Sequence, residues 1–294
     1  MIFAMGPALL FCPGDRPDRF GKAAERADAV ILDLEDAVGP DAKSATREAV
    51  AAAIVDPERT IVRVNAIGEG MLEADLDAAR SAGVTTIMLA KAESARQLDA
   101  LDGFAVVALC ETAAGVVHAA DIAAHPNVVA LMWGAEDLVA SIGGTSSRDA
   151  TGAYRAVATH ARSHVLLAAA ASGKRAIDAI RTDIADVDGC RVEALDAAAS
   201  GFAAKAAIHP SHVAPIREAF APTAEEADWA ERVLAAAADH PGVLSFEGRM
   251  VDEPILRHAR SVRARAAAIR TTTDSLPTRQ GTATDVPRAP EEES

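Results

Sequence analysis

Polar side chains recur in this sequence immediately after short apolar runs. They are Asp33, Glu35, Asp36, Arg63, Asn65, Lys91, Glu93, Glu111, Thr112, Glu136, Asp137 and His209. Carboxylates outnumber cations in this set, and such an excess suits a divalent ion that prefers oxygen ligands, such as Mg²⁺. Any single acid could instead stabilise the first turn of a helix. For the whole set a metal site is favoured, because Glu is a poor N-cap and Glu111 directly follows an apolar run.

The elements that must position these side chains alternate along the chain. Near-continuous apolar runs predict buried parallel strands, and Ala-rich segments between them predict helices. The strands are expected at 8–12, 29–35, 60–65, 85–91, 104–111, 128–134, 175–182 and 204–209. The helices are expected at 18–27, 41–53, 72–82, 94–101, 115–124, 151–172, 189–200 and 212–220. This pattern predicts a (β/α)8 TIM barrel, whose active site lies at the carboxyl ends of the strands. A doubly wound sheet is the alternative, weakened because no GxGxxG follows the first strand.

The C-terminal part of the chain has a different pattern. A helix at 223–239, a strand-like GVLSF at 242–246 and an Arg-rich helix at 254–269 predict a helical appendage to the barrel. Residues from Thr271 onward lack an apolar period and are rich in Thr, Pro and charge, which is typical of a disordered tail. We therefore expect a catalytic barrel at 1–222, an appendage or lid at 223–270 and a tail at 271–294.

Composition narrows the function classes. A formal net charge of −14 over 294 residues argues against binding to nucleic acid or to anionic membranes. The sequence shows neither a signal-peptide pattern nor an apolar stretch long enough to span a membrane, so we expect a cytoplasmic protein. Cys12, Cys110 and Cys190 lie far apart in apolar stretches, which predicts buried reduced thiols.

Eight segments together resemble the citrate lyase β-subunit-like proteins of the HpcH/HpaI aldolase superfamily, which includes malyl-CoA and citramalyl-CoA lyases. In order, they are LLFCPGDRPDRF, VILDLEDAV, IVRVN, MLAKAES, CETAAG, MWGAEDL, AIHPSH and FEGRMVDEP. They extend over about residues 6 to 268. The resemblance implies a Mg²⁺-dependent barrel, with Mn²⁺ as a substitute, that cleaves or forms a C–C bond between an acyl-CoA and a 2-oxo acid. It also implies a homo-oligomer, with a trimer favoured.

The resemblance assigns roles to particular residues. Glu111 and Asp137 would be the metal carboxylates, and Arg63 would bind the thioester carbonyl and the substrate carboxylate. Asp252 would be the catalytic acid or base, delivered by the appendage over a neighbouring subunit's site. The substrate-binding set comprises Phe11, Arg16, Lys22, Arg63, Glu111, Glu136, Ile208 and His209.

These residue types suit the chemistry that the resemblance implies. Cleavage of a malyl-CoA or citramalyl-CoA type ester releases acetyl-CoA or propionyl-CoA with glyoxylate or pyruvate. A permanently charged, bidentate Arg63 can stabilise the enolate oxygen, and Asp252 can exchange a proton with the enolate carbon. Glu35, Asp36 and Lys91 would support the metal site from a second layer.

Each assignment has a structural alternative. Arg63 could simply pair with Asp33 or Glu35, and Lys91 could be their salt-bridge partner. Arg16 could be a surface cation, and Asp252 could cap the helix after Pro254. Among signals outside these motifs, His160 and His164 are spaced for zinc but have no third ligand nearby in the sequence. His212 is expected to be a cap or surface residue, and the Gly/Ser-rich stretch 141–152 a loop near the mouth.

Three competing functions remain. A citrate lyase β subunit acting on a citryl thioester is less favoured, because the chain shows no carrier-protein or transferase segment. A Schiff-base aldolase would use Lys91 or Lys205 as its nucleophile. A CoA-ester-binding assembly subunit would have a catalytically idle barrel.

Overall fold

The computed structural model describes residues 3–238 and 242–275. It divides into two compact units, which meet in the sequence between Phe220 and Ala221. We had placed this boundary after residue 222. Each unit has a hydrophobic core of its own.

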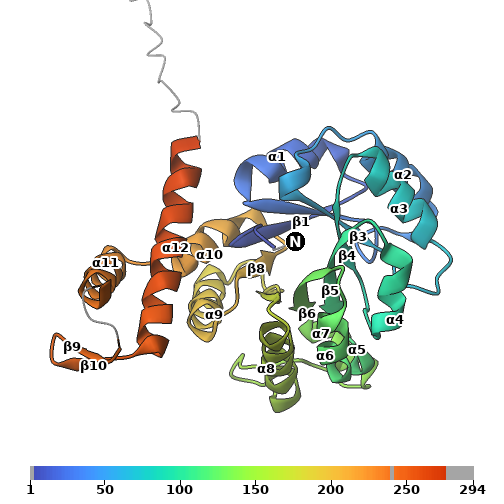
Figure 1. Ribbon diagram of the computed structural model, residues 1–294. Coiled ribbons are helices and arrows are strands. Elements are labelled where there is room, and N and C mark those ends of the chain that lie inside the picture. The colour runs from blue at the N-terminus through green and yellow to red at the C-terminus, as the bar shows by residue number, and fades with distance from the viewer. Residues whose placement is uncertain (1–2, 239–241, 276–294) are drawn as a thin grey trace, which may run out of the picture. The chain divides into compact units, whose positions relative to one another are not determined.

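The first unit is a closed barrel of eight parallel strands surrounded by helices (Figure 1). The strands are β1 (Ala8–Pro13), β2 (Ala29–Asp33), β3 (Thr60–Val64), β4 (Thr86–Leu89), β5 (Ala105–Cys110), β6 (Val128–Trp133), β7 (Arg175–Asp178) and β8 (Ala204–Ala207). Each strand pairs with its neighbours in sequence, and β1 also pairs with β8. This closure confirms the (β/α)8 prediction and excludes the doubly wound sheet.

Helical segments follow the strands in turn. They are η1 (Pro17–Arg19), α1 (Phe20–Arg26), η2 (Pro40–Ala42), α2 (Lys43–Ala51), η3 (Pro57–Arg59), α3 (Leu72–Ser81), α4 (Ala95–Leu98), η4 (Asp99–Leu101), α5 (Ala113–Val117), α6 (Ala119–Ala124), α7 (Ala135–Ser141), α8 (Ala156–Ala171), α9 (Val187–Ser200), η5 (Pro210–His212) and α10 (Val213–Phe220).

Three details of the predicted elements are wrong. The helix predicted at 151–172 begins only at Ala156, because Tyr154 still belongs to the preceding loop, where it pairs with Arg148. Helix α7 was not predicted, because it has only seven residues and ends before a Gly-Gly pair. Several strands were predicted too long at their carboxyl ends, where the chain already turns into its loop. After β4, for example, Lys91 has a φ of +50°, which is incompatible with a strand.

Strand alternation gives the barrel two apolar layers. Leu9 and Ile31 belong to the cluster inside the barrel, whereas Leu10 and Leu32 belong to the larger cluster between strands and helices. The three cysteines are free and buried, as predicted. Burial raises the pKa of Cys12 to about 11 and that of Cys110 to about 12, which keeps both thiols protonated.

The second unit contains α11 (Ala224–Ala238), the antiparallel hairpin β9 (Leu244–Phe246) and β10 (Arg249–Val251), and α12 (Glu253–Ser275). The prediction that the tail begins at 271 is wrong for residues 271–275, which continue α12. The rest of the predicted tail, 276–294, lies outside the described residues. Within the described part of the chain, no helix is both long and apolar enough to cross a membrane.

Candidate active site

The carboxyl ends of the barrel strands surround a cavity of about 360 Å³. Its lining residues are Phe11, Pro13, Asp33, Asp36, Ala37, Arg63, Leu109, Glu111, Met132, Trp133, Gly134, Ala135, Glu136, Asp137, Ala179, Ile180 and Ile208. Most of the polar members lie at or just after strand ends. Apolar members such as Leu109 and Met132 come from the interior layer beneath them. The cavity therefore has a charged rim above an apolar floor.

Arg63, on β3, is the central cation of the cavity. Its Nε and Nη2 donate to the two carboxylate oxygens of Asp33 at 2.7 and 2.6 Å, and its Nη1 lies 2.9 Å from an oxygen of Glu35. Burial alone would lower the pKa of Arg63, but Asp33 and Glu35 raise it above its ordinary value. Two of the five guanidinium N–H groups are therefore hydrogen-bonded to Asp33, and Nη1 is held by its ion pair with Glu35.

Lys91 follows β4 and joins the acids of two loops. Its ammonium contacts Glu35, lies 3.3 Å from Asp36 and lies 4.0 Å from Asp137. Although partial burial opposes it, the contact with Glu35 raises the pKa of Lys91, so this amine stays protonated. Lys91 also lowers the pKa of Asp36, against the effect of that residue's own partial burial.

Glu111 follows β5 and is almost fully buried. One of its oxygens accepts the backbone N–H of Lys91 at 3.1 Å. Burial, followed by the nearby charge of Asp137, raises the pKa of Glu111 to about 8. Gly134 is required beside it, because a Cβ there would lie only 2.9 Å from the Cβ of Glu111. Without a bound cation, the Glu111 side chain is therefore mostly protonated at neutral pH, and such a cation would favour its ionised form.

Asp137 and Glu136 lie in the first turn of α7. Asp137 is 38% exposed and borders the cavity on the side of Lys91. Glu136 accepts a hydrogen bond from the buried hydroxyl of Ser147 at 2.7 Å. The loop 141–152, predicted to lie near the mouth, therefore reaches the cavity rim through Ser147.

The charges around the cavity do not balance. In and beside the cavity there are two cations, Arg63 and Lys91, and six acids, which leaves four formal negative charges in excess. The acids are Asp33, Glu35, Asp36, Glu111, Glu136 and Asp137. Among residues 3–238 and 242–275 no three His, Cys, Asp or Glu side chains are grouped closely enough to enclose a metal ion. The site therefore suits a hard cation that takes few protein ligands and keeps water or substrate oxygens, as Mg²⁺ does.

Comparison with known proteins identifies the family of this chain. The family model of HpcH/HpaI aldolase/citrate lyase matches residues 8–210. The chain belongs to this family. A citrate lyase subunit beta-like protein of Mycobacterium tuberculosis is 53% identical over 263 residues, covering 90% of this chain and 96% of the relative. The mitochondrial citramalyl-CoA lyase of Rattus norvegicus is 31% identical, covering 90% and 86% respectively.

A solved structure shows the same fold. The crystal structure of protein CitE from Mycobacterium tuberculosis, in complex with magnesium, acetoacetate and coenzyme A, matches with a TM-score of 0.85 at 53% identity. It covers 90% of this chain and 100% of that one. The resemblance to the HpcH/HpaI family seen in the sequence is confirmed. Since this is a family of aldolases and lyases, the expectation of a carbon–carbon lyase is confirmed at that level.

Of the other residues assigned from the family resemblance, some line the cavity and others do not. Phe11 and Ile208 line the cavity, and the Arg63 guanidinium lies 5.0 Å from the centre of the Phe11 ring. Arg16 is exposed and pairs with Asp18 at 3.1 Å, and Lys22 is exposed on α1. His209 is outside the cavity lining, because its ring accepts the backbone N–H of Ser211 and caps η5. Asp252 is in the second unit, and its carboxylate caps α12 by accepting from Ile255 N at 3.4 Å.

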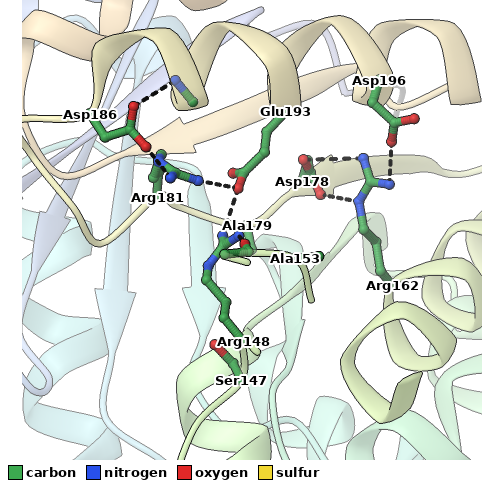
Figure 2. Close-up of polar contacts among 12 residues, drawn as sticks. Ser147, Arg148, Ala153, Arg162, Asp178, Ala179, Arg181, Asp186, Glu193 and Asp196 are labelled. Atoms are coloured by element: carbon green, nitrogen blue, oxygen red, sulfur yellow. Dashed lines mark hydrogen bonds and ion pairs between the residues drawn. The ribbon is translucent and has the colours of Figure 1, made fainter. Parts of the chain in front are cut away.

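Lys205 serves a structural network rather than the cavity. It is fully buried, and its ammonium contacts Asp178 at 3.2 Å, Ala179 O at 2.6 Å and Glu193 at 3.3 Å. Figure 2 shows the arginines that complete this network: Arg162 on Asp178, and Arg148 and Arg181 on Glu193. With Lys205 tied to carboxylates and Lys91 kept protonated, neither amine is placed as a Schiff-base nucleophile.

His160 and His164 lie outside the family motifs and do not form a metal site. His160 and His164 stack with ring centroids 5.8 Å apart beside apolar side chains, and the described part of the chain offers them no third ligand. The prediction for His212 is wrong. It is fully buried, because η5 turns its ring into the protein, and burial lowers its pKa.

Lys43 was not among the predicted site residues. It lies in the first turn of the helical segment formed by η2 and α2, where the helix dipole disfavours a cation. A lysine in the first turn of a predicted helix is the sequence feature that could have identified Lys43 as a functional residue. Its ammonium contacts the loop that carries Glu35.

Proposed function

We propose that this protein is a Mg²⁺-dependent C–C lyase acting on a 3-hydroxyacyl-CoA of the malyl-CoA or citramalyl-CoA type. The products would be acetyl-CoA or propionyl-CoA with glyoxylate or pyruvate. The observation that carries the proposal is the unbalanced ring of carboxylates around Arg63, with Glu111 buried and its pKa raised to about 8. The ligands of the CitE structure, magnesium, acetoacetate and coenzyme A, support the same combination of metal, small oxo acid and thioester.

Glu111 and Asp137 would hold the ion from two sides of the cavity. When bound, Mg²⁺ supplies Lewis-acid polarisation of the oxygens on the oxo-acid half of the substrate. The N–H groups of Arg63 that are not hydrogen-bonded to Asp33 are suited to the thioester oxygen, where negative charge develops in the enolate. Asp33 and Glu35 hold the guanidinium plane in a fixed orientation for this contact with the thioester oxygen. Phe11 and Ile208 would contact the CoA half and exclude water.

Removal of the metal is the direct test of this function. We expect purified protein to cleave at least one ester among malyl-CoA, methylmalyl-CoA and citramalyl-CoA, with glyoxylate or pyruvate released. EDTA should abolish the cleavage, and Mg²⁺ or Mn²⁺ should restore it, because the excess carboxylates lose their counter-charge with the ion. The measurement is oxo-acid release followed by a coupled dehydrogenase. Cleavage that persists in a thoroughly chelated sample, or a borohydride-trapped adduct on Lys91, would overturn the proposal.

Asp252 supplies the proton to the enolate carbon in this proposal. Replacing it with asparagine removes the acid but preserves an oxygen that can cap α12, so the second unit should stay folded. We expect Asp252→Asn to lower kcat by about 10²–10⁴-fold while CoA-ester binding is retained. Steady-state kinetics and calorimetric titration with the ester measure the two effects. Glu253→Gln is the matched control, since Glu253 is exposed and pairs with Arg260.

The same variant tests whether Asp252 serves a neighbouring copy. We propose a homo-oligomer, with a trimer favoured, in which Asp252 acts on another subunit's cavity. Mixing inactive Asp252→Asn with inactive Glu111→Gln and allowing exchange should then restore part of the activity, since some cavities regain both groups. No recovery after complete exchange would show that each chain uses its own Asp252.

A further inference from the structure

Lys43 holds the backbone that carries Glu35. Its ammonium donates to Leu34 O at 2.7 Å, to Glu35 O at 2.7 Å and to the side-chain oxygen of Asn65 at 2.6 Å. An ammonium has three donors, so all three are used. Two of them bind consecutive carbonyls of the loop directly after β2.

The position of Lys43 is locally unfavourable. It lies in the first turn of the continuous helical segment formed by η2 and α2, where the partial positive charge of the helix dipole favours an acid. The ammonium is also drawn away from solvent, because its three acceptors surround it and the residue is only partly exposed. A residue that is unfavourable for its own helix often has a compensating role in tertiary structure or function. For Lys43 that role is to fix the backbone of the loop 34–36.

Asn65 strengthens this hold. Its amide donates to Leu34 O at 3.0 Å and to the buried carboxylate of Asp75 at 2.6 Å. Arg47, one helical turn after Lys43 on α2, donates to the other oxygen of Asp75 at 2.6 Å. The loop after β2 is thus anchored to β3, α2 and α3 from outside the cavity.

The other side of the loop faces the cavity. The carboxylate of Glu35 is ion-paired with Arg63 at 2.9 Å and accepts a hydrogen bond from Lys91. It also accepts from the backbone N–H of Asp36 at 2.9 Å. A shift of the Glu35 backbone would therefore remove the close partner of Lys91 and one of the two acids that hold Arg63.

We propose that Lys43 is a positioning residue of the active site. It fixes the backbone at Leu34 and Glu35 so that the Glu35 carboxylate stays between Arg63 and Lys91. Lys43 acts through Glu35 and does not touch the cavity, whose lining excludes it. The catalytic part of this inference rests on the proposed lyase function, whereas its structural part can be measured without any substrate.

The structural part is tested by hydrogen exchange. The amides of Asp36, Ala37 and Val38 are bonded to oxygens of Asp33 and Glu35, so they report on the loop. Lys43→Met should raise exchange in a peptide covering 34–38 by about tenfold or more, because the loop opens locally. The matched control is Lys174→Met, a partly exposed lysine before β7. Unchanged exchange in Lys43→Met would overturn the inference even if the protein cleaves no ester.

The catalytic part is tested by a double-mutant cycle with Glu35→Gln. In wild-type background, Lys43→Met should lower kcat by about 10–100-fold with little change in KM, as for other residues that orient a site from behind. In Glu35→Gln background the same change should cost less than about twofold, because the group it positions is already altered. An equal loss in both backgrounds would show that Lys43 acts independently of Glu35. A wild-type protein inactive on every ester refutes the proposed function instead, and leaves the exchange result standing.

Discussion

Arg63→Lys is expected to lower kcat by about 10²–10³-fold, as loss of a donor to a developing oxyanion does in other enzymes. Lysine keeps the positive charge but cannot reproduce the planar fork that spans both oxygens of Asp33. Its single ammonium would be captured by Asp33 and Glu35, which leaves no fixed donors for a substrate oxygen. Steady-state kinetics on the best ester in the presence of Mg²⁺ measure the effect.

Arg63→Met separates catalysis from stability. Methionine leaves Asp33 and Glu35 buried without their main cation, and breaking a buried pair in this way costs about 3–5 kcal/mol. Urea unfolding should therefore show a large loss for Arg63→Met and a smaller one for Arg63→Lys. Arg80→Lys is the control, because Arg80 makes an exposed pair with Asp77. If Arg63→Lys retains wild-type kcat, Arg63 is only the structural partner of Asp33.

Much of the barrel could be predicted from local sequence. The strands are continuous apolar runs because both of their faces are covered, as the fully buried β2 and β5 show. Once eight strand–helix pairs are recognised, closure and the position of the site follow from the architecture. Glu111 stood out from sequence alone for the same reason, since it directly follows the buried run of β5.

The contacts within the site could not be predicted in the same way. The left-handed backbone of Lys91 aims its N–H at Glu111, and this conformation is imposed by tertiary contacts rather than by residue type. Ser147 reaches Glu136 from a loop that carries no periodic signal. Lys43 and Asn65 meet only because β2 and β3 are neighbours. Such contacts join segments far apart in the chain, so composition and spacing do not reveal them.

Sequence and structure give complementary information about the acids at and after the end of β2. The three acids of VILDLEDAVGP mark the site in the sequence, but their separate tasks appear only in the structure. Asp33 binds Arg63, Glu35 joins Arg63 to Lys91, and Asp36 contacts Lys91 from the cavity rim. The three acids therefore orient the cations of the site.

Glu111→Gln is expected to lower metal-dependent activity by more than about 10²-fold, because changes even one layer behind a metal ligand cost 10–100-fold in metal affinity or activity. Glutamine keeps the shape between Gly134 and the Lys91 N–H but removes the charge. Calorimetric titration should show weaker Mg²⁺ binding together with the lost turnover. A variant that binds Mg²⁺ and cleaves esters normally would remove Glu111 from the metal site.

The same variant should be more stable than the wild type in the absence of metal, in a pH-dependent way. The pKa of Glu111 is raised from 4.5 to about 8. Below the lower value both folded and unfolded chains are protonated, and the residue costs nothing. Between the two values only the unfolded chain loses the proton, so the free energy of unfolding of the wild type falls as pH rises and levels off above about 8. Thermal unfolding in EDTA should therefore show an advantage of Glu111→Gln that grows from pH 5 to pH 8. Saturating Mg²⁺ should cancel or reverse it, since bound ion stabilises only the wild type. An advantage that does not change with pH would mean that Glu111 is already ionised without the metal.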